Sequence, residues 1–99
     1  MTRFPPRAHV LILHEVEDYA AWKIVFDRAA PLRKAAGELS FQVLTHPADA
    51  NRVVHFSRWV SLEAARRFFE SPELARIRQE AGVRAPTFIY LNEVDAGAL

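Results

Sequence analysis

The sequence predicts one α+β domain, spanning residues 1–99, in which two helical segments cover one face of a four-stranded antiparallel sheet. Four apolar runs of strand length alternate with two segments of helical periodicity, in the order β-α-β-β-α-β. The turn between the second and third runs, HPADAN, is too short for the crossover that parallel strands need. A length of 99 residues fits one small domain, and a hydrophobic fraction of 51% is high for such a domain, which favours a surface that binds a partner.

The N-terminal part of the chain predicts one strand and one helix. Residues 1–7 contain two consecutive prolines, which block regular pairing, so the first strand is expected over residues 9–16 (HVLILHEV). Asp18 can cap a helix over residues 18–30, in which apolar side chains recur at i, i+3, i+4 and i+7 from Trp22.

Pro31 marks a change in the path of the chain, because proline removes a helical hydrogen bond and clashes with the preceding turn. A kink or break is expected there, followed by a short turn that ends at Gly37, a suitable C-terminal cap. The second strand is expected over residues 39–45 (LSFQVLT) and the third over residues 52–60 (RVVHFSRWV).

The C-terminal part predicts a second helical segment and the last strand. A serine can cap a helix over residues 61–70, and a Ser-Pro pair at 71–72 restarts the helix, which continues to Gly82. Pro86 precedes the last strand, expected over residues 87–94 (TFIYLNEV). This order of elements is typical of a ferredoxin-like domain.

Alternation along the strands divides their side chains between the two faces of the sheet. We assign the wholly apolar row to the layer under the helices. The mixed row is then too apolar for open water, and it predicts a homodimer interface or a ligand pocket. The apolar row contains Leu11, Leu13, Phe41, Val43, Val54, Phe56, Ile89 and Leu91. The mixed row contains Val10, Ile12, His14, Gln42, Leu44, His46, His55, Ser57, Trp59, Phe88, Tyr90 and Asn92.

Composition excludes several functional classes. A formal net charge of +1 provides no field that would attract nucleic acid or an anionic membrane. The chain has no cysteine, which rules out disulfides, thiol chemistry and cysteine-ligated metals. No signal peptide or membrane-spanning run is apparent, so a cytoplasmic protein is expected.

Three segments carry a resemblance to a known family: EDYAAWKIVFDRAAPLRKAAG, RWVSLEAARRFFESPELARIRQEAGV and APTFIYL. Together they resemble the dimeric α/β-barrel superfamily, and especially its antibiotic-biosynthesis-monooxygenase-like branch, over residues 9–94. The resemblance implies a homodimer that forms a dimeric α/β barrel. Members include cofactor-independent oxygenases of aromatic polyketides, haem-degrading enzymes and cyclases.

Two positions separate this chain from parts of that superfamily. Phe68 stands where oxygenase-like members often have His or Trp, and Arg78 stands where haem-degrading members place a His ligand. The first-strand Asn of the haem-degrading members corresponds to His14. We therefore expect neither haem nor another cofactor.

His14, His55 and Tyr90 are the candidate catalytic residues. The two histidines share the mixed row on different strands, and a His can remove an acidic proton from a phenol or a 1,3-dicarbonyl compound. The phenolic hydroxyl of Tyr90 must find a partner if it is buried. The alternative for each histidine is a hydrogen-bonded interface residue. The spacings HxH and HExxH are absent, so no metal site is expected.

Other residues are expected to contact a flat aromatic ligand, since ligand pockets are mostly apolar with a few directed polar groups. The alternative for the two phenylalanines is ordinary core. A group of arginines around the second helical segment is expected to form a solvated face. The candidate binding residues are Trp59, Phe68, Phe69, Ser57 and Asn92; the arginines are Arg66, Arg67, Arg76, Arg78 and Arg84.

Two functions remain open at this level. The first is a small-molecule enzyme of secondary metabolism, a cofactor-independent monooxygenase or cyclase that acts on an aromatic or polyketide-like substrate. The second is a non-catalytic dimeric protein that binds a hydrophobic metabolite or serves as a scaffold. In both cases the expected partners are a second copy of the chain and a small hydrophobic or aromatic molecule, with no nucleic acid and no membrane.

Overall fold

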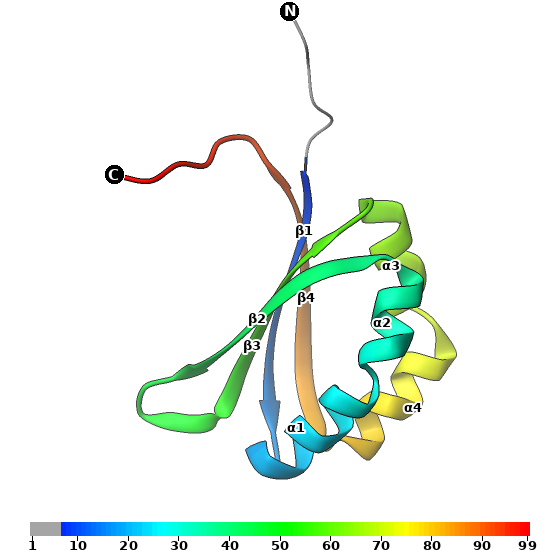
Figure 1. Cartoon of the computed structure of the whole chain (residues 1–99). Helices are drawn as coiled ribbons and strands as arrows, with labels where there is room; N and C mark the ends of the chain where they lie inside the picture. Colours follow the sequence, from blue (N-terminus) through cyan, green and yellow to red (C-terminus); the bar gives the residue numbers. More distant parts are fainter. Residues whose placement is uncertain (1–6) are drawn as a thin grey trace, which may run out of the picture.

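A computed structural model describes residues 7–99 and confirms the ferredoxin-like α+β fold. The antiparallel sheet has the strand order β2-β3-β1-β4, and all helices lie on one side of it (Figure 1). The expected lead-in at residues 1–7 lies outside the described residues, except that Arg7 begins the first strand. The elements are β1 (Arg7–Val16), α1 (Tyr19–Arg28), α2 (Ala30–Ala36), β2 (Glu38–His46), β3 (Asp49–Trp59), α3 (Leu62–Phe69), α4 (Pro72–Glu80) and β4 (Val83–Glu93).

The predicted helix caps are confirmed. Asp18 accepts a hydrogen bond from the backbone N–H of Ala21 at 2.9 Å. Ser61 and Ser71 cap α3 and α4 in the same way, each through its hydroxyl oxygen. These caps satisfy N–H groups that the helix itself leaves unpaired, and so they set where each helix begins.

The segment between α1 and β2 is more helical than predicted. The break falls at Ala29, and Pro31 lies in the first turn of α2, where its missing N–H costs nothing. Gly37 ends α2, as predicted, with φ at 123°. A Cβ at this position would lie 2.7 Å from Cγ2 of Val60. Only glycine therefore allows the chain to turn here and place residue 38 at the start of β2.

The last strand begins earlier than predicted. It starts at Val83, and Pro86 lies inside it rather than before it. The pairing of β1 with β4 shifts register between Leu13 and Glu15, which leaves a bulge on β4 opposite His14. Proline is tolerated there because β4 is an edge strand and a bulge leaves one residue unpaired. Ala85, next to Pro86, has a positive φ of 47°.

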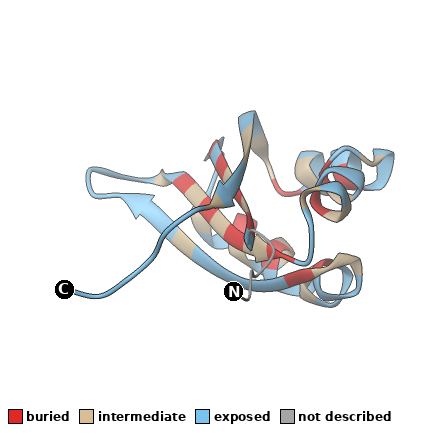
Figure 2. Cartoon of the chain, turned by 90° about the horizontal axis from the view of Figure 1, so that it is seen from above, coloured by how far each residue is buried: buried red, intermediate tan, exposed pale blue. Residues whose placement is uncertain are grey.

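The assignment of the two rows to the faces of the sheet is wrong. The mixed row faces the helices: Val10, His14, His55 and Trp59 are all buried, whereas Leu13 of the apolar row is 42% exposed. Figure 2 shows the buried residues gathered where the sheet meets the helices. The alternation of side chains along the strands does not reveal which face is buried, because the helices and β2 supply hydrogen-bond partners for the polar groups of the mixed row.

Strand β2 also departs from the predicted grouping. Val43 pairs with His55 and Phe41 pairs with Ser57, so both β2 residues belong to the helix-facing side. Gln42 and Leu44 consequently lie on the open side of the sheet. That open side keeps a continuous apolar set, formed by Leu11, Leu13, Leu44, Val54, Phe56, Ile89 and Leu91; we call it the open face.

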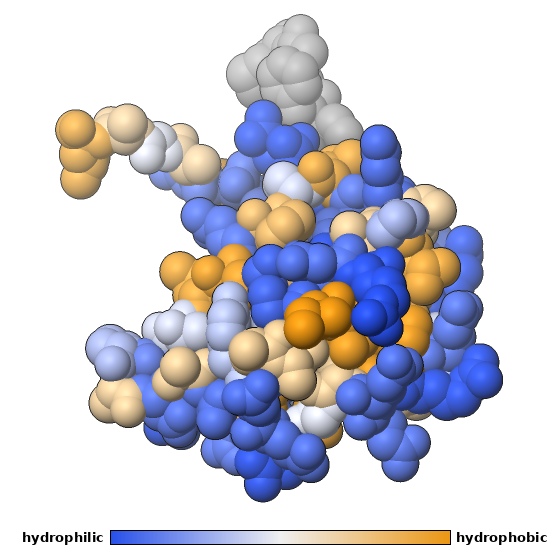
Figure 3. Space-filling view, turned by 60° about the horizontal axis from the view of Figure 1, so that its bottom comes forward, coloured by the Kyte–Doolittle hydropathy of each residue, from blue (hydrophilic) through white to orange (hydrophobic). Residues whose placement is uncertain are grey.

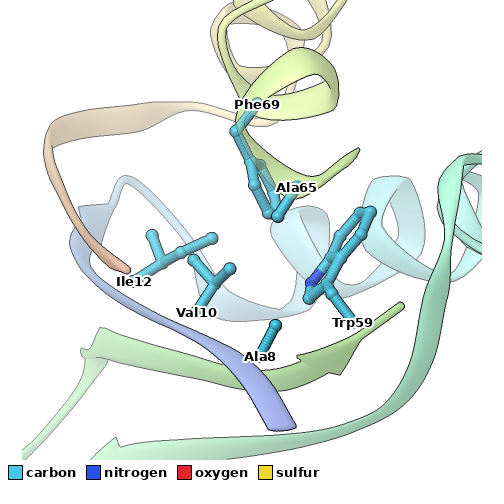
Figure 4. Close-up of a cluster of buried hydrophobic side chains, with 6 residues drawn as sticks. All are labelled: Ala8, Val10, Ile12, Trp59, Ala65 and Phe69. Atoms are coloured by element: carbon cyan, nitrogen blue, oxygen red, sulfur yellow. The ribbon is translucent and has the colours of Figure 1, made fainter. Parts of the chain in front are cut away.

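The core lies between the sheet and the helices in two clusters. The first joins Trp59 and Phe69 to small and aliphatic residues of β1 and α3 (Figure 4). The indole N–H of Trp59 donates to the hydroxyl of Ser57 at 2.8 Å, so both polar groups are satisfied inside the core. The second cluster is built around Trp22 and Phe26 of α1.

Hydrophobic groups nevertheless remain at the surface of the single chain, among hydrophilic ones (Figure 3). Within residues 7–99, no helix is long and apolar enough to cross a membrane.

Candidate active site

A cavity of about 70 Å³ lies between the helix-facing side of the sheet and the helices. This volume holds several water molecules. Its walls come from α1, α2, the end of α3 and α4, and from the strands β1, β3 and β4. The lining residues are Ile12, His14, Trp22, Val25, Phe26, Ala29, Arg33, His55, Phe68, Phe69, Leu74, Ile77, Arg78, Ala81, Val83, Pro86 and Phe88.

The structure brings four of the predicted site residues together at this cavity, namely His14, His55, Phe68 and Phe69. The other four do not line it. Ser57 and Trp59 bond to each other in the neighbouring core cluster. Tyr90 packs against that cluster, with the guanidinium of Arg66 4.8 Å from its ring centroid, and Asn92 is exposed.

His14 lies on β1 opposite the bulge and is only 9% exposed. Neither of its ring nitrogens has a hydrogen-bond partner among the described residues. Burial, and then the charge of His55, lowers the pKa of His14 to about 4. His14 is therefore neutral near pH 7, with one ring nitrogen free to donate and the other free to accept.

His55 lies on β3 and is held by both a carboxylate and aromatic rings. Its Nε2 lies 2.8 Å from Oε2 of Glu38. The ring of Phe26 meets it edge-on, with centroids 4.9 Å apart, and Phe69 approaches at 6.3 Å. These contacts restrict the imidazole to one orientation beside the cavity.

Glu38 is held in turn by Arg33, at the end of α2. Nε of Arg33 donates to Oε1 of Glu38 at 2.7 Å, and its Nη1 donates to the backbone oxygen of Phe26. Burial alone would raise the pKa of Glu38, but the hydrogen bonds and charges of His55 and Arg33 outweigh it and hold the pKa below its usual value. Glu38 is thus an ionised carboxylate inside the protein.

Sequence reasoning missed Arg33, Glu38 and the role of Arg78. Glu38 comes directly after a glycine cap and just before the predicted second strand, a place where a charged residue gave no signal of burial. Arg78 was expected on a solvated face, but it lines the cavity and donates to the backbone oxygen of Phe69 at 3.0 Å. Burial lowers its pKa. The other four arginines of that group are exposed, as expected; they are Arg66, Arg67, Arg76 and Arg84.

The arrangement suits a flat ligand that loses a proton. Aromatic rings form the walls, and the polar groups of the lining are imidazole and guanidinium nitrogens. No carboxylate belongs to the lining among the described residues, so an anion formed in the cavity meets no like charge there. Within residues 7–99, no three His, Asp or Glu side chains gather as metal ligands.

Solved structures share this fold. SnoaB, a cofactor-independent oxygenase from Streptomyces nogalater, aligns with a TM-score of 0.77 and 16% identity, covering 93% of this chain and 97% of its own. Rv0793 from Mycobacterium tuberculosis aligns with a TM-score of 0.65 and 20% identity, covering 95% and 100%.

A third structure contains a ligand. It is a monooxygenase from the gene ActVA-Orf6 of Streptomyces coelicolor, in complex with nanaomycin D, and it aligns with a TM-score of 0.64 and 19% identity, covering 95% of this chain and 93% of that one. No curated protein matches this chain in sequence.

The sequence itself carries the family pattern over most of its length. The model of the family described as antibiotic biosynthesis monooxygenase matches residues 9–80, from β1 through the end of α4. This match includes both cavity histidines and the Arg33–Glu38 pair. The chain belongs to the antibiotic biosynthesis monooxygenase family.

Proposed function

We propose that this chain is a cofactor-independent monooxygenase that binds a small aromatic, polyketide-like compound in the cavity between the sheet and the helices. The observation that carries this proposal is the pair of histidines in a cavity whose other lining residues, apart from Arg33 and Arg78, are apolar or aromatic. Family membership supports it, as do the fold shared with SnoaB and the ligand held by the ActVA-Orf6 monooxygenase.

His55 is the proposed base, and His14 is the proposed hydrogen-bonding partner of the substrate. Because its pKa is lowered to about 4, His14 is a weak base, but it donates and accepts as a neutral ring. His55 removes a proton from an activated CH₂ group of the substrate. The resulting anion supplies four electrons to O₂; one oxygen atom becomes a new carbonyl and the other leaves as water.

The predicted residues away from the lining take supporting roles in this proposal. Ser57 and Trp59 hold the core beside the cavity through their mutual hydrogen bond. Tyr90 and Asn92 remain predicted contacts for a ligand larger than the cavity, because they lie farther along β4 on the same side as Phe88.

We also propose that two copies pair through the open face, as the family resemblance implies. Leu13, Leu44 and Leu91 are between 39% and 50% exposed in the single chain. Burying a large apolar side chain contributes about 1.5–3 kcal/mol, so covering the seven residues of the open face favours association.

The test is oxygen uptake with a polycyclic phenol of the polyketide type whose keto tautomer has an activated CH₂ group, using ¹⁸O₂ and mass spectrometry of the product. We expect one ¹⁸O atom in the product and one in water. His55→Gln is expected to lower kcat by about 10²-fold or more, the usual contribution of a general base. His46→Gln, on an exposed residue of the β2–β3 hairpin, is the control and should leave kcat unchanged.

Two outcomes would contradict the proposal. Conversion of the phenol without oxygen uptake would indicate a cyclase. Tight binding without any conversion would indicate a binding protein.

A further inference from the structure

A hydrogen-bonded series of three side chains, Arg33, Glu38 and His55, lies behind the cavity and is nearly inaccessible to solvent. The side chains of both Glu38 and His55 are 5% exposed, and so is that of Arg33. These three side chains come from three elements, since Arg33 is on α2, Glu38 begins β2 and His55 is in the middle of β3. Such buried ion pairs lose so much hydration that apolar residues of similar size usually pack as stably. Its presence therefore calls for an explanation beyond stability.

The ionised carboxylate fixes the protonation of the imidazole. A carboxylate only accepts hydrogen bonds, so Nε2 of His55, 2.8 Å from Oε2 of Glu38, must carry a proton. In the neutral ring Nδ1 then holds the free electron pair. Among the described residues, no group hydrogen-bonds to Nδ1 of His55, and the residue lines the cavity.

Arg33 fixes the carboxylate in its turn. It binds Oε1 of Glu38, so each carboxylate oxygen has its own partner and the group cannot rotate without losing both bonds. Arg33 is itself anchored, because its guanidinium carbon lies 3.7 Å from the ring centroid of Phe26 and its Nη1 bonds the backbone of α1. Phe26 also meets His55 edge-on, which closes the arrangement into a ring of contacts.

We propose that Glu38 is a positioning residue, which holds His55 in the tautomer whose Nδ1 acts as the base, and that Arg33 orients Glu38 for this task. This inference rests on the proposed oxygenase function. When Nδ1 takes a proton from the substrate, the imidazole becomes a cation, and the adjacent carboxylate stabilises that charge. A carboxylate has the same effect on the histidine of a Ser-His-Asp triad.

The test combines ¹⁵N NMR of the histidine side chains with steady-state kinetics. In the wild type we expect the neutral His55 ring to be protonated at Nε2 only. In Glu38→Gln the amide can donate as well as accept, so we expect a mixture of the two tautomers. We expect kcat to fall at least tenfold while KM stays within threefold, and Glu38→Asp to recover part of kcat.

Two further variants keep the test decisive. Glu63→Gln removes a carboxylate that bonds Arg67 on the exposed side of α3, and it should change neither the tautomer nor kcat. If Glu38→Gln does not fold, Arg33→Lys keeps the positive charge but loses the second anchoring bond. We expect it to lower kcat severalfold and to broaden the His55 signals.

The outcomes separate this inference from the proposed function. An unchanged His55 tautomer in Glu38→Gln overturns the inference, and so does a changed tautomer with an unchanged kcat. If the wild type shows no oxygenase activity, the proposed function fails. The tautomer alone then decides whether Glu38 positions His55.

Discussion

Each side of the sheet carries one glutamate–histidine pair, and the two pairs differ in what surrounds them. On the helix-facing side, Glu38 and His55 are 2.8 Å apart with side chains 5% exposed. On the open face, Glu93 and His9 are 3.2 Å apart with side chains 27% and 14% exposed. The same two residue types thus form a buried, oriented chain in one place and a partly solvated contact in the other.

The difference lies in the third partner and in the packing. Arg33 binds the second oxygen of Glu38 deep inside, whereas the nearest cation to Glu93 is the exposed Arg7 at 3.8 Å. His55 is clamped by perpendicular rings, whereas His9 stacks on a single ring, that of Phe56. Burial and a fixed third group convert an ordinary contact into one that can hold a tautomer.

The largest expected difference between the two sides concerns stability. Trp59→Ala is expected to lower the free energy of unfolding by about 3–5 kcal/mol, because a fully buried indole is lost and a cavity remains. Phe56→Ala, on the same strand but on the open face, is expected to cost less than half as much in the monomeric chain. Urea unfolding of both variants measures this. Equal losses would show that the two sides contribute alike to the core.

The second prediction concerns acid. His14 has a folded pKa of about 4 against 6.5 for the ordinary group, so the unfolded chain binds more protons between these values. Stability is therefore lost as pH falls through that window. We expect about 2 kcal/mol between pH 6.5 and 4.5.

The measurement is thermal unfolding in steps between pH 6.5 and 4.5. The pKa of Glu38 is lowered from 4.5, so the stability that Glu38 contributes is lost mainly below this pH range. His14→Leu is expected to flatten the curve, and His46→Leu, on the exposed hairpin, to leave it as it is. A wild-type curve without slope would mean that His14 is protonated in the folded protein.

The third prediction tests the open face as an interface. Leu13→Ala is expected to remove about 1 kcal/mol of apolar burial per copy, which raises the dissociation constant of a symmetric dimer roughly 30-fold. Ile24→Ala, on the exposed side of α1, is the matched control and is expected to change nothing. Sedimentation equilibrium gives both values. A wild-type mass of 11.3 kDa at micromolar concentration would remove the interface altogether.

The smallest expected effect returns to the glutamate–histidine pairs. Glu93→Gln is expected to change stability by less than about 1 kcal/mol, since a partly exposed pair contributes little. The His9 ring is expected to respond in ¹⁵N spectra while that of His55 does not. A response of His55 to Glu93→Gln would show that the two sides of the sheet are coupled through β1.

The order of elements, three helix caps and both helix breaks could be predicted because each depends on local chemistry. Asp18, Ser61 and Ser71 act on amides only three residues away, and Gly37 adopts a conformation that few other residues reach. The side of the sheet on which a row lies is not local. It depends on which side chains the other elements place against that row. The row that contains His55 can be buried because Glu38, at the start of β2, forms a hydrogen bond with the imidazole.

The candidate site shows the same limit. His14 and His55 could be found because a histidine in an apolar strand is conspicuous. Arg33 and Glu38 could not, since each follows or precedes a helix end where charged residues are ordinary and solvated. Only the path of the chain through Gly37 brings the two together.

Gly37 therefore bears on how this protein tolerates mutation. It lines no part of the cavity described above and carries no side chain, yet any larger residue there would meet Val60 and shift the first residue of β2. In a collection of random variants screened for turnover alone, substitutions at position 37 would lower turnover as substitutions of a catalytic residue do. Its intolerance would reflect the placement of Glu38, and a smaller residue at position 60 would not by itself restore tolerance, because a φ of 123° strains any residue that has a Cβ.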